Sequence, residues 1–100
     1  MTEKLMVNIV WHMHQPFYWN EEKGFFDFPW VRTHATKDYL FMGKLVEKFP
    51  SLRATFNFSP SLLRQFQLYL EGREDEIMKL AKKRASSLTE EDKRLIKENF

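Results

Sequence analysis

The chain has 100 residues, enough for one small domain or for part of a larger one. Sixteen basic and fourteen acidic residues leave a formal net charge of +2, too little positive charge to indicate a nucleic-acid partner. Cysteine is absent, which excludes disulfides, thiolate nucleophiles and thiolate metal ligands. Because no apolar run has the length of a membrane span or the pattern of a signal peptide, we expect a cytoplasmic protein without membrane contact.

The N-terminal third combines a buried strand with a long aromatic segment. Residues 5–11 are apolar except for Asn8, which predicts a strand covered on both faces, as in a parallel sheet. Residues 12–33 contain two prolines and a glycine without sustained periodicity, so we expect a long loop. The aromatic content around this loop argues against disorder. These aromatic residues are Trp11, Phe17, Tyr18, Trp19, Phe25, Phe26, Phe28 and Trp30.

The middle of the chain predicts a helix and then a second strand. Residues 35–49 place apolar side chains on one helical stripe, and the following proline ends it. Residues 53–58 predict a strand, after which Ser59 is placed to cap a helix and Pro60 to occupy its first position. We expect that helix to end near Gly72. The strand–helix–strand order predicts a parallel pair of strands.

Two more helices are expected near the C-terminal end, over residues 75–85 and from Thr89 onward, with Thr89 as the N-cap. The basic run at 82–84 is interpreted as a solvated helix face, and the acids at 71–76 and 90–92 as surface charge. Because two parallel strands cannot cover their own faces and edges, we expect this α/β chain to be the opening of a longer barrel or open sheet.

A pair of histidines follows the first predicted strand. His12 and His14 are two residues apart, so in an extended backbone their rings point to the same side. Three interpretations stay open. In the first, one histidine packs beneath the loop and the other is solvated. In the second, the pair is half of a zinc-type site, as in metal-dependent amidohydrolase barrels. In the third, the imidazoles and the Gln15 amide hydrogen-bond sugar hydroxyls while nearby aromatic rings contact the pyranose faces.

Three stretches of the chain, taken in order, match the motifs of a known family. The first is His12-Met13-His14-Gln15-Pro16 after an apolar strand. The second is PWVRTHATKDY at residues 29–39, and the third is ATFNFSPSLL at residues 54–63. Together they resemble glycoside hydrolase family 57, which contains α-amylase-like enzymes, amylopullulanases, 4-α-glucanotransferases and glycogen branching enzymes. The likeness covers most of residues 5–72.

The resemblance implies a seven-stranded (β/α) barrel that acts on α-glucans with retention of configuration. Residues 1–100 would be its N-terminal portion, with two parallel strands and several helices. The family's glutamate nucleophile and aspartate acid/base lie on later strands, so we expect no catalytic residue in this chain. No metal or cofactor is expected. The resemblance implies that His14 lines the subsite of the scissile bond and that His12 lies beside it.

Aromatic residues and one acid of the predicted loop are further candidates for sugar contact. Trp19 and Trp30, with Tyr18, are candidate platforms for a pyranose ring. The competing interpretation is that these rings seal the loop against the barrel. Asp27 lies in the same segment and is a candidate to reach a sugar hydroxyl.

Polar residues outside the histidine pair are candidates for the same cleft. Arg32 and His34 are predicted to reach it, with a surface ion pair competing for Arg32 and helix capping for His34. Asn57 is predicted at the carboxyl end of the second strand, where it contacts substrate or braces the His14 ring. Ser59 is interpreted mainly as an N-cap.

Two functional alternatives stay open beside the α-glucan enzyme. One is a non-catalytic carbohydrate-binding module, and the other is part of a metal-dependent deacetylase or amidohydrolase barrel. The sequence leaves hydrolysis against transfer, and α-1,4 against α-1,6 linkages, undecided. The expected partners are an α-glucan or maltooligosaccharide and the remainder of the barrel.

Overall fold

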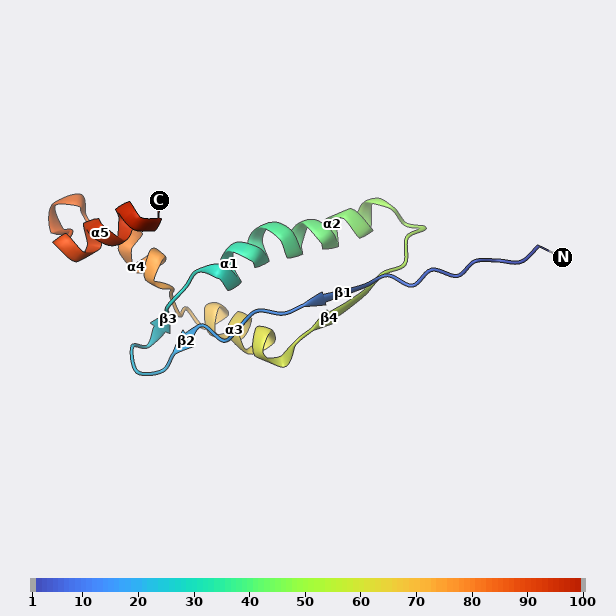
Figure 1. The fold of residues 1–100 in the computed structure, drawn as a ribbon, viewed down its shortest axis with the longest axis horizontal. Coiled ribbons are helices and arrows are strands. Elements are labelled where there is room, and N and C mark those ends of the chain that lie inside the picture. Colours follow the sequence, from blue (N-terminus) through green and yellow to red (C-terminus); the bar gives the residue numbers. More distant parts are fainter. Residues whose placement is uncertain (1, 100) are drawn as a thin grey trace.

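The computed structural model describes residues 2–99, which form an elongated α/β unit of 73 × 25 × 22 Å. Figure 1 shows the long helical segment beside a narrow sheet, with the C-terminal helices at the end opposite the N-terminus. The radius of gyration is 18.9 Å, whereas a compact domain of this length has about 13 Å. Much of the chain therefore lies outside a common core.

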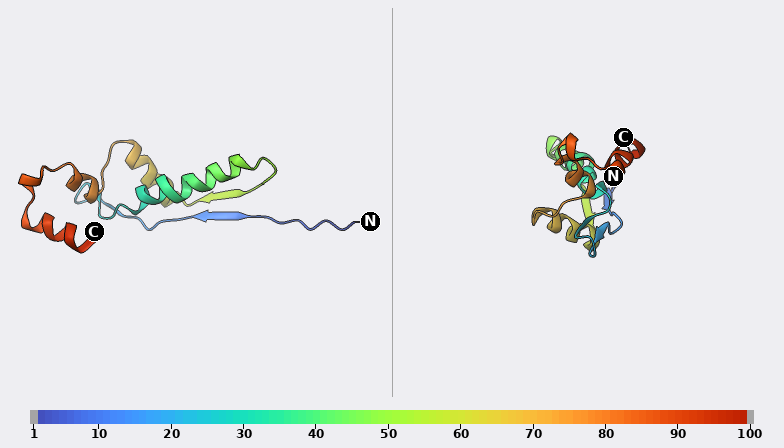
Figure 2. Two further views of the ribbon diagram at one scale, coloured as in Figure 1. Left: turned by 90° about the horizontal axis from the view of Figure 1, so that it is seen from above. Right: turned by 90° about the vertical axis from the view of Figure 1, so that its left-hand side faces the viewer.

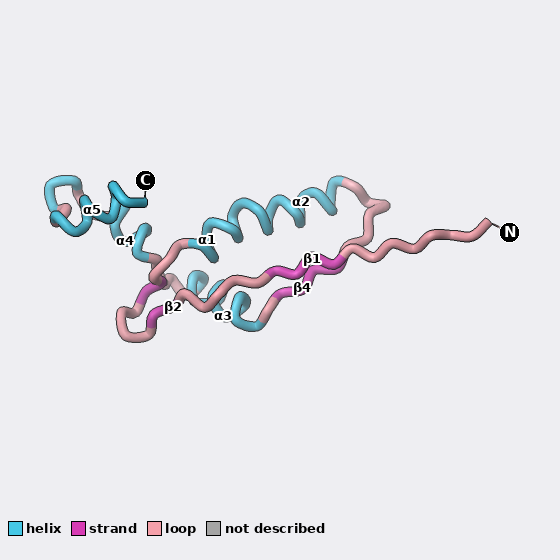
Figure 3. The backbone as a smooth tube through the Cα atoms, in the orientation of Figure 1, coloured by secondary structure: helices cyan, strands magenta, loops and turns pink. Residues whose placement is uncertain are grey.

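The sheet consists of two parallel strands, as predicted. β1 (Val10–Met13) pairs with β4 (Thr55–Phe58), with His12 opposite Asn57 in the register. The prediction of a first strand at 5–11 is wrong at both ends. Backbone pairing reaches back only to the Ile9 carbonyl, which accepts from the Thr55 amide, because the partner strand starts there. The apolar residues before it run extended and exposed (Figures 1 and 3).

The segment predicted as a plain loop contains a small hairpin. β2 (Trp19–Asn20) pairs antiparallel with β3 (Phe25–Phe26), and Gly24 in the turn has a φ of 70°. Phe26 is fully buried, and its ring stacks on Tyr69 with 4.2 Å between the centroids. The prediction missed this pairing because two-residue strands are too short to show a period in the sequence.

The first helical segment starts earlier than predicted and contains a wide turn. It comprises α1 (Trp30–His34), a π-helical turn at Ala35–Tyr39 and α2 (Leu40–Lys48). The predicted start at 35 is wrong because Pro29, whose φ is −84°, already directs the chain into a helix. In the wide turn, the Leu40 amide donates to the Ala35 carbonyl five residues back.

The later helices are close to the prediction. α3 (Pro60–Leu70) has Ser59 as its N-cap and proline at its first position, as expected. α4 (Glu76–Ala81) is capped by Asp75 and is shorter than predicted, because the chain turns extended at Arg84 before a 3₁₀ turn at Ala85–Ser87. α5 (Glu90–Asn99) follows the expected cap: Thr89 Oγ1 accepts from the Asp92 amide at 3.1 Å.

The core lies on one face of the two strands. Met13 of β1, Val31 of α1 and Leu62 of α3 are buried together, and Phe56 of β4 packs against them. Figure 2 shows the α1–α2 helical segment running alongside the sheet. Because strand residues alternate between faces, His12 points to the opposite, open face. Within residues 2–99, no helix combines the length and the apolar character that crossing a membrane requires.

Candidate functional site

The carboxyl ends of β1 and β4 bring four polar side chains together on the open face. His12 Nδ1 lies 2.7 Å from Asn57 Oδ1, and His14 Nδ1 lies 3.1 Å from Ser59 Oγ. The two imidazoles are nearly parallel, at 8°, with 6.1 Å between their centroids. We call His12, His14, Asn57 and Ser59 the histidine edge. Both histidines are exposed, so the interpretation that buries one of them beneath the loop is wrong.

The register of the parallel strands decides which residue supports which histidine. Of the two roles predicted for Asn57, bracing the His14 ring is wrong, because residue 57 lies opposite residue 12 and contacts His12. Its contact with substrate stays a prediction. Ser59, two residues further along, takes the corresponding position beside His14. Since the amide oxygen of Asn57 only accepts, His12 Nδ1 carries a proton and donates it. Nε2 is then the His12 ring nitrogen available to a ligand.

Gln15, the next residue after His14, is held by two tyrosines. Its Nε2 donates to the Tyr39 hydroxyl at 3.0 Å, and the Tyr18 hydroxyl donates to its Oε1 at 3.3 Å. Burial and the nearby Tyr39 raise the pKa of Tyr18, which keeps this hydroxyl protonated. The buried Gln65 of α3 fixes the backbone of the residues that follow Gln15, since it donates to the Pro16 carbonyl and accepts from the Tyr18 amide, both at 2.9 Å.

The two candidate tryptophans differ in their freedom. Trp19 packs edge-on against Phe26 at 5.1 Å, and its indole N–H donates to the Glu21 carboxylate. The Arg73 guanidinium lies 5.9 Å from the Trp19 ring centroid. Trp30 is 46% exposed at the start of α1. The geometry thus favours sealing for Trp19 and leaves Trp30 available to a ligand.

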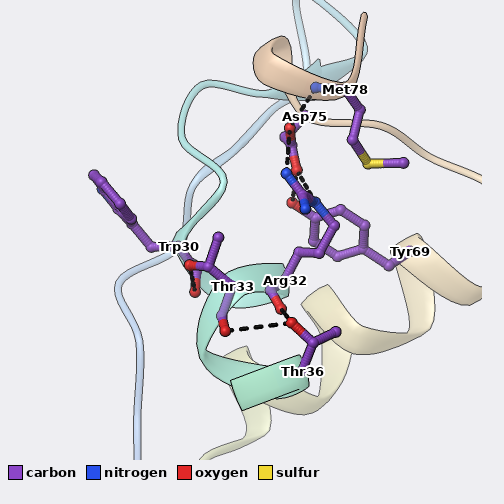
Figure 4. Close-up of polar contacts among 7 residues, drawn as sticks. All are labelled: Trp30, Arg32, Thr33, Thr36, Tyr69, Asp75 and Met78. Carbon is purple, nitrogen blue, oxygen red and sulfur yellow. Dashed lines mark hydrogen bonds and ion pairs between the residues drawn. The ribbon is translucent and has the colours of Figure 1, made fainter. Parts of the chain in front are cut away.

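Arg32 joins a second polar cluster, centred on Asp75 (Figure 4). Its Nε donates to Asp75 Oδ2 at 2.7 Å and its Nη2 to Oδ1 at 3.3 Å. The Tyr69 hydroxyl and the Met78 amide donate to the same carboxylate at 3.0 and 2.8 Å. We call these four residues the Asp75 cluster. Asp75 is fully buried, so the prediction that the acids at 71–76 are all surface charge is wrong.

The electrostatics of the Asp75 cluster are those of a closed ion pair. Burial alone would raise the pKa of Asp75, but the hydrogen bonds from Arg32, Met78 and Tyr69 lower it below its ordinary value. Burial and the neighbouring carboxylate raise the pKa of Tyr69 far above its ordinary value. Hydrogen bonding to Asp75 also raises the pKa of Arg32. The cluster therefore stays charged and complete at neutral pH.

His34, the other predicted ligand on this helix, also has a partner. Its Nδ1 lies 2.7 Å from Asp38 Oδ2, one helical turn further on, and both side chains are partly exposed. Contact of His34 or Arg32 with a sugar stays a prediction. Within residues 2–99, no group of three or more histidine, aspartate or glutamate side chains is arranged to hold a metal ion.

Sequence reasoning overlooked three residues that organise the site. Gln65 carries a signal, because it is a polar residue between the apolar positions Leu62 and Leu68 of one helix. Asp75 stands at the N-cap of a predicted helix, a position where carboxylates are common. Tyr39 was assigned to the apolar helical stripe, and nothing in the sequence pointed to its hydrogen bond with Gln15.

The fold and the histidine edge define a class of protein. Parallel strands covered by helices on one face, with imidazole and amide groups at their carboxyl ends, are the architecture of α/β proteins that bind ligands at that edge. Residues 8–98 match the sequence profile of Glycosyl hydrolase family 57, and the chain belongs to this family. Its function is thus of the glycoside hydrolase or transglycosylase type, with carbohydrate as substrate. No curated protein and no solved structure matches the chain significantly.

Proposed function

We propose that residues 1–100 are the N-terminal portion of a seven-stranded (β/α) barrel that acts on α-glucans with retention of configuration. The histidine edge carries the proposal, because it projects from the carboxyl ends of parallel strands on the face that the helices leave open. In such barrels, helices pack outside and the carboxyl ends of the strands line the active site. Exposed apolar side chains at Leu5, Met6 and Val7 support further strands beside this pair.

The histidine edge, Gln15 and Trp30 have supporting roles in this proposal. His14 and His12 hydrogen-bond the substrate or the charge that develops on it. Asn57 orients His12, and the Gln15 amide offers one donor and one acceptor to sugar hydroxyls. Trp30 is the proposed sugar platform.

The bond-breaking carboxylates are proposed to lie on later strands. Retaining hydrolysis needs a nucleophile and a general acid about 5–5.5 Å apart, and the acid needs a raised pKa. Asp27 does not meet this need, because hydrogen bonds from Asn20 and Lys23 lower its pKa. Asp75 is buried against Arg32. We place the protein in the cytoplasm, since a chain without cysteine suits a reducing compartment.

Assay of the full-length protein on a panel of oligosaccharides tests the proposal. We expect cleavage or transfer with maltoheptaose and none with cellohexaose, and proton NMR should show the α-anomer as the first product. Activity on β-glucans alone, or first release of the β-anomer, would contradict it. Calorimetry with maltooligosaccharides separates the binding-module alternative, which predicts binding without turnover. Stoichiometric zinc in metal analysis would favour the deacetylase alternative.

A further inference from the structure

The side-chain amide of Gln15 is held at both ends by tyrosine hydroxyls, those of Tyr39 and Tyr18. In either orientation of the amide, the two hydroxyls use one N–H and one lone pair. The second N–H and the second lone pair stay available to a ligand. We infer that Tyr39 is a positioning residue that fixes the Gln15 amide for sugar binding, an inference that rests on the proposed function.

The wide turn in the helix is what brings Tyr39 to Gln15. In a regular α-helix, Tyr39 would lie about 80° around the axis from Val31, eight residues earlier. The extra residue of the Ala35–Tyr39 turn gives Tyr39 the angular position of a residue seven places on, within about 20° of Val31. Val31 is fully buried against Met13 and Leu62, and Tyr39 accordingly packs on the same cluster.

Packing then holds the Tyr39 hydroxyl in place. The Tyr39 ring meets Phe66 of α3 edge to face, with 6.4 Å between the centroids at 73°. The backbone that carries Gln15 is tied to the same helix through the buried Gln65. Both partners of the hydrogen bond thus rest on α3 and the core, so the side-chain amide of Gln15, the residue after His14, is fixed before substrate arrives. Such prior ordering reduces the entropy lost on binding.

A double-mutant cycle on the full-length protein tests this role. Tyr39→Phe removes the hydroxyl and keeps the ring, and we expect kcat/KM for the sugar substrate to fall roughly three- to tenfold. Gln15→Ala should lower kcat/KM at least as much. The combined variant should be no worse than Gln15→Ala alone, because Tyr39 acts through Gln15. Losses that multiply in the combined variant would overturn the inference.

Tyr69→Phe is the matched control. Tyr69 lines the same apolar cleft as Tyr39, but its hydroxyl serves Asp75 and not Gln15. We expect this variant to lower Tm and to keep kcat/KM within about twofold of the wild type. A Tyr39→Phe variant that likewise changes only Tm would overturn the positioning role. The cycle is measured with whichever carbohydrate the wild type turns over. A wild type that is inactive on α-glucans would therefore contradict the proposed function, while the role of Tyr39 is still decided by the double-mutant cycle.

Discussion

The histidine edge and the Asp75 cluster both join side chains from distant parts of the sequence, but the histidines are exposed and Asp75 is buried. Each joins side chains more than forty residues apart in the sequence, His12 with Asn57 and Arg32 with Asp75. In the histidine edge, both imidazoles are exposed and each has one ring nitrogen without a contact to Asn57 or Ser59. In the Asp75 cluster, three groups surround a carboxylate that is fully buried.

The difference shows how to separate binding residues from structural ones in this chain. A buried carboxylate is tolerated only when charge and hydrogen bonds compensate for lost water, so its partners have little capacity left for a ligand. Exposed imidazoles braced on one side keep that capacity. We therefore expect substitutions in the Asp75 cluster to change stability, and substitutions in the histidine edge to change activity.

The largest effect is expected for Asp75→Ala, which removes the acceptor of Arg32 and the N-cap of α4. Urea unfolding should show a loss of about 2–4 kcal/mol, a range that allows for the partial exposure of Arg32. Asp38→Ala, which breaks the partly exposed pair with His34, is the control and should change stability by at most about 0.5 kcal/mol. Equal losses would mean that burial does not distinguish the two pairs.

His14→Ala should lower kcat/KM of the full-length enzyme about a hundredfold, the usual cost of losing one stabilising group at the reaction centre. Tm should change little, because the side chain is exposed. His34→Ala should lose less, since the Nδ1 of His34 is directed to Asp38. Normal kinetics in His14→Ala would remove the histidine edge from the site.

Asn57→Ala should have a smaller effect on activity, about three- to tenfold in kcat/KM, because it removes one hydrogen bond that orients His12. Asn57→Asp keeps an acceptor beside the ring and should recover part of the loss. Steady-state kinetics of both variants provide the measurement. Equal activities of the two variants would show that orientation of His12 through residue 57 is unimportant.

The smallest effect is expected in the pH dependence of stability. The contribution of the Asp75 charge to the free energy of unfolding should hardly vary near pH 7 and should decrease in acid. Because the pKa of Asp75 is lowered in the folded protein, its ionised form stabilises the fold above the unfolded value of about 3.9. The difference in unfolding free energy between the wild type and Asp75→Asn should be constant near pH 7 and shrink as pH falls below about 4. A difference that grows in acid would mean that burial, rather than the hydrogen bonds, dominates the pKa.

Local features of the sequence predicted much of the fold. The α3 helix with its Ser59 cap, the second strand and the Thr89 cap are confirmed, because each depends on neighbouring residues. The hairpin of β2 and β3 was missed, and the first strand was placed too early, because pairing depends on which distant strand is adjacent. The sequence predicted helices that have an apolar face or a capping residue, but it did not predict how far the strands pair.

The sequence by itself determined that His12 and His14 share one side of a strand end and that the motifs around them belong to one family. Only the tertiary structure decided that Asn57 supports His12 and Ser59 supports His14, because the register of parallel strands sets these pairs. It also decided that Arg32 pairs with a buried Asp75 and that Tyr39 contacts Gln15 through the wide turn. Contacts between residues distant in the sequence depend on how the chain packs, and no local pattern encodes them.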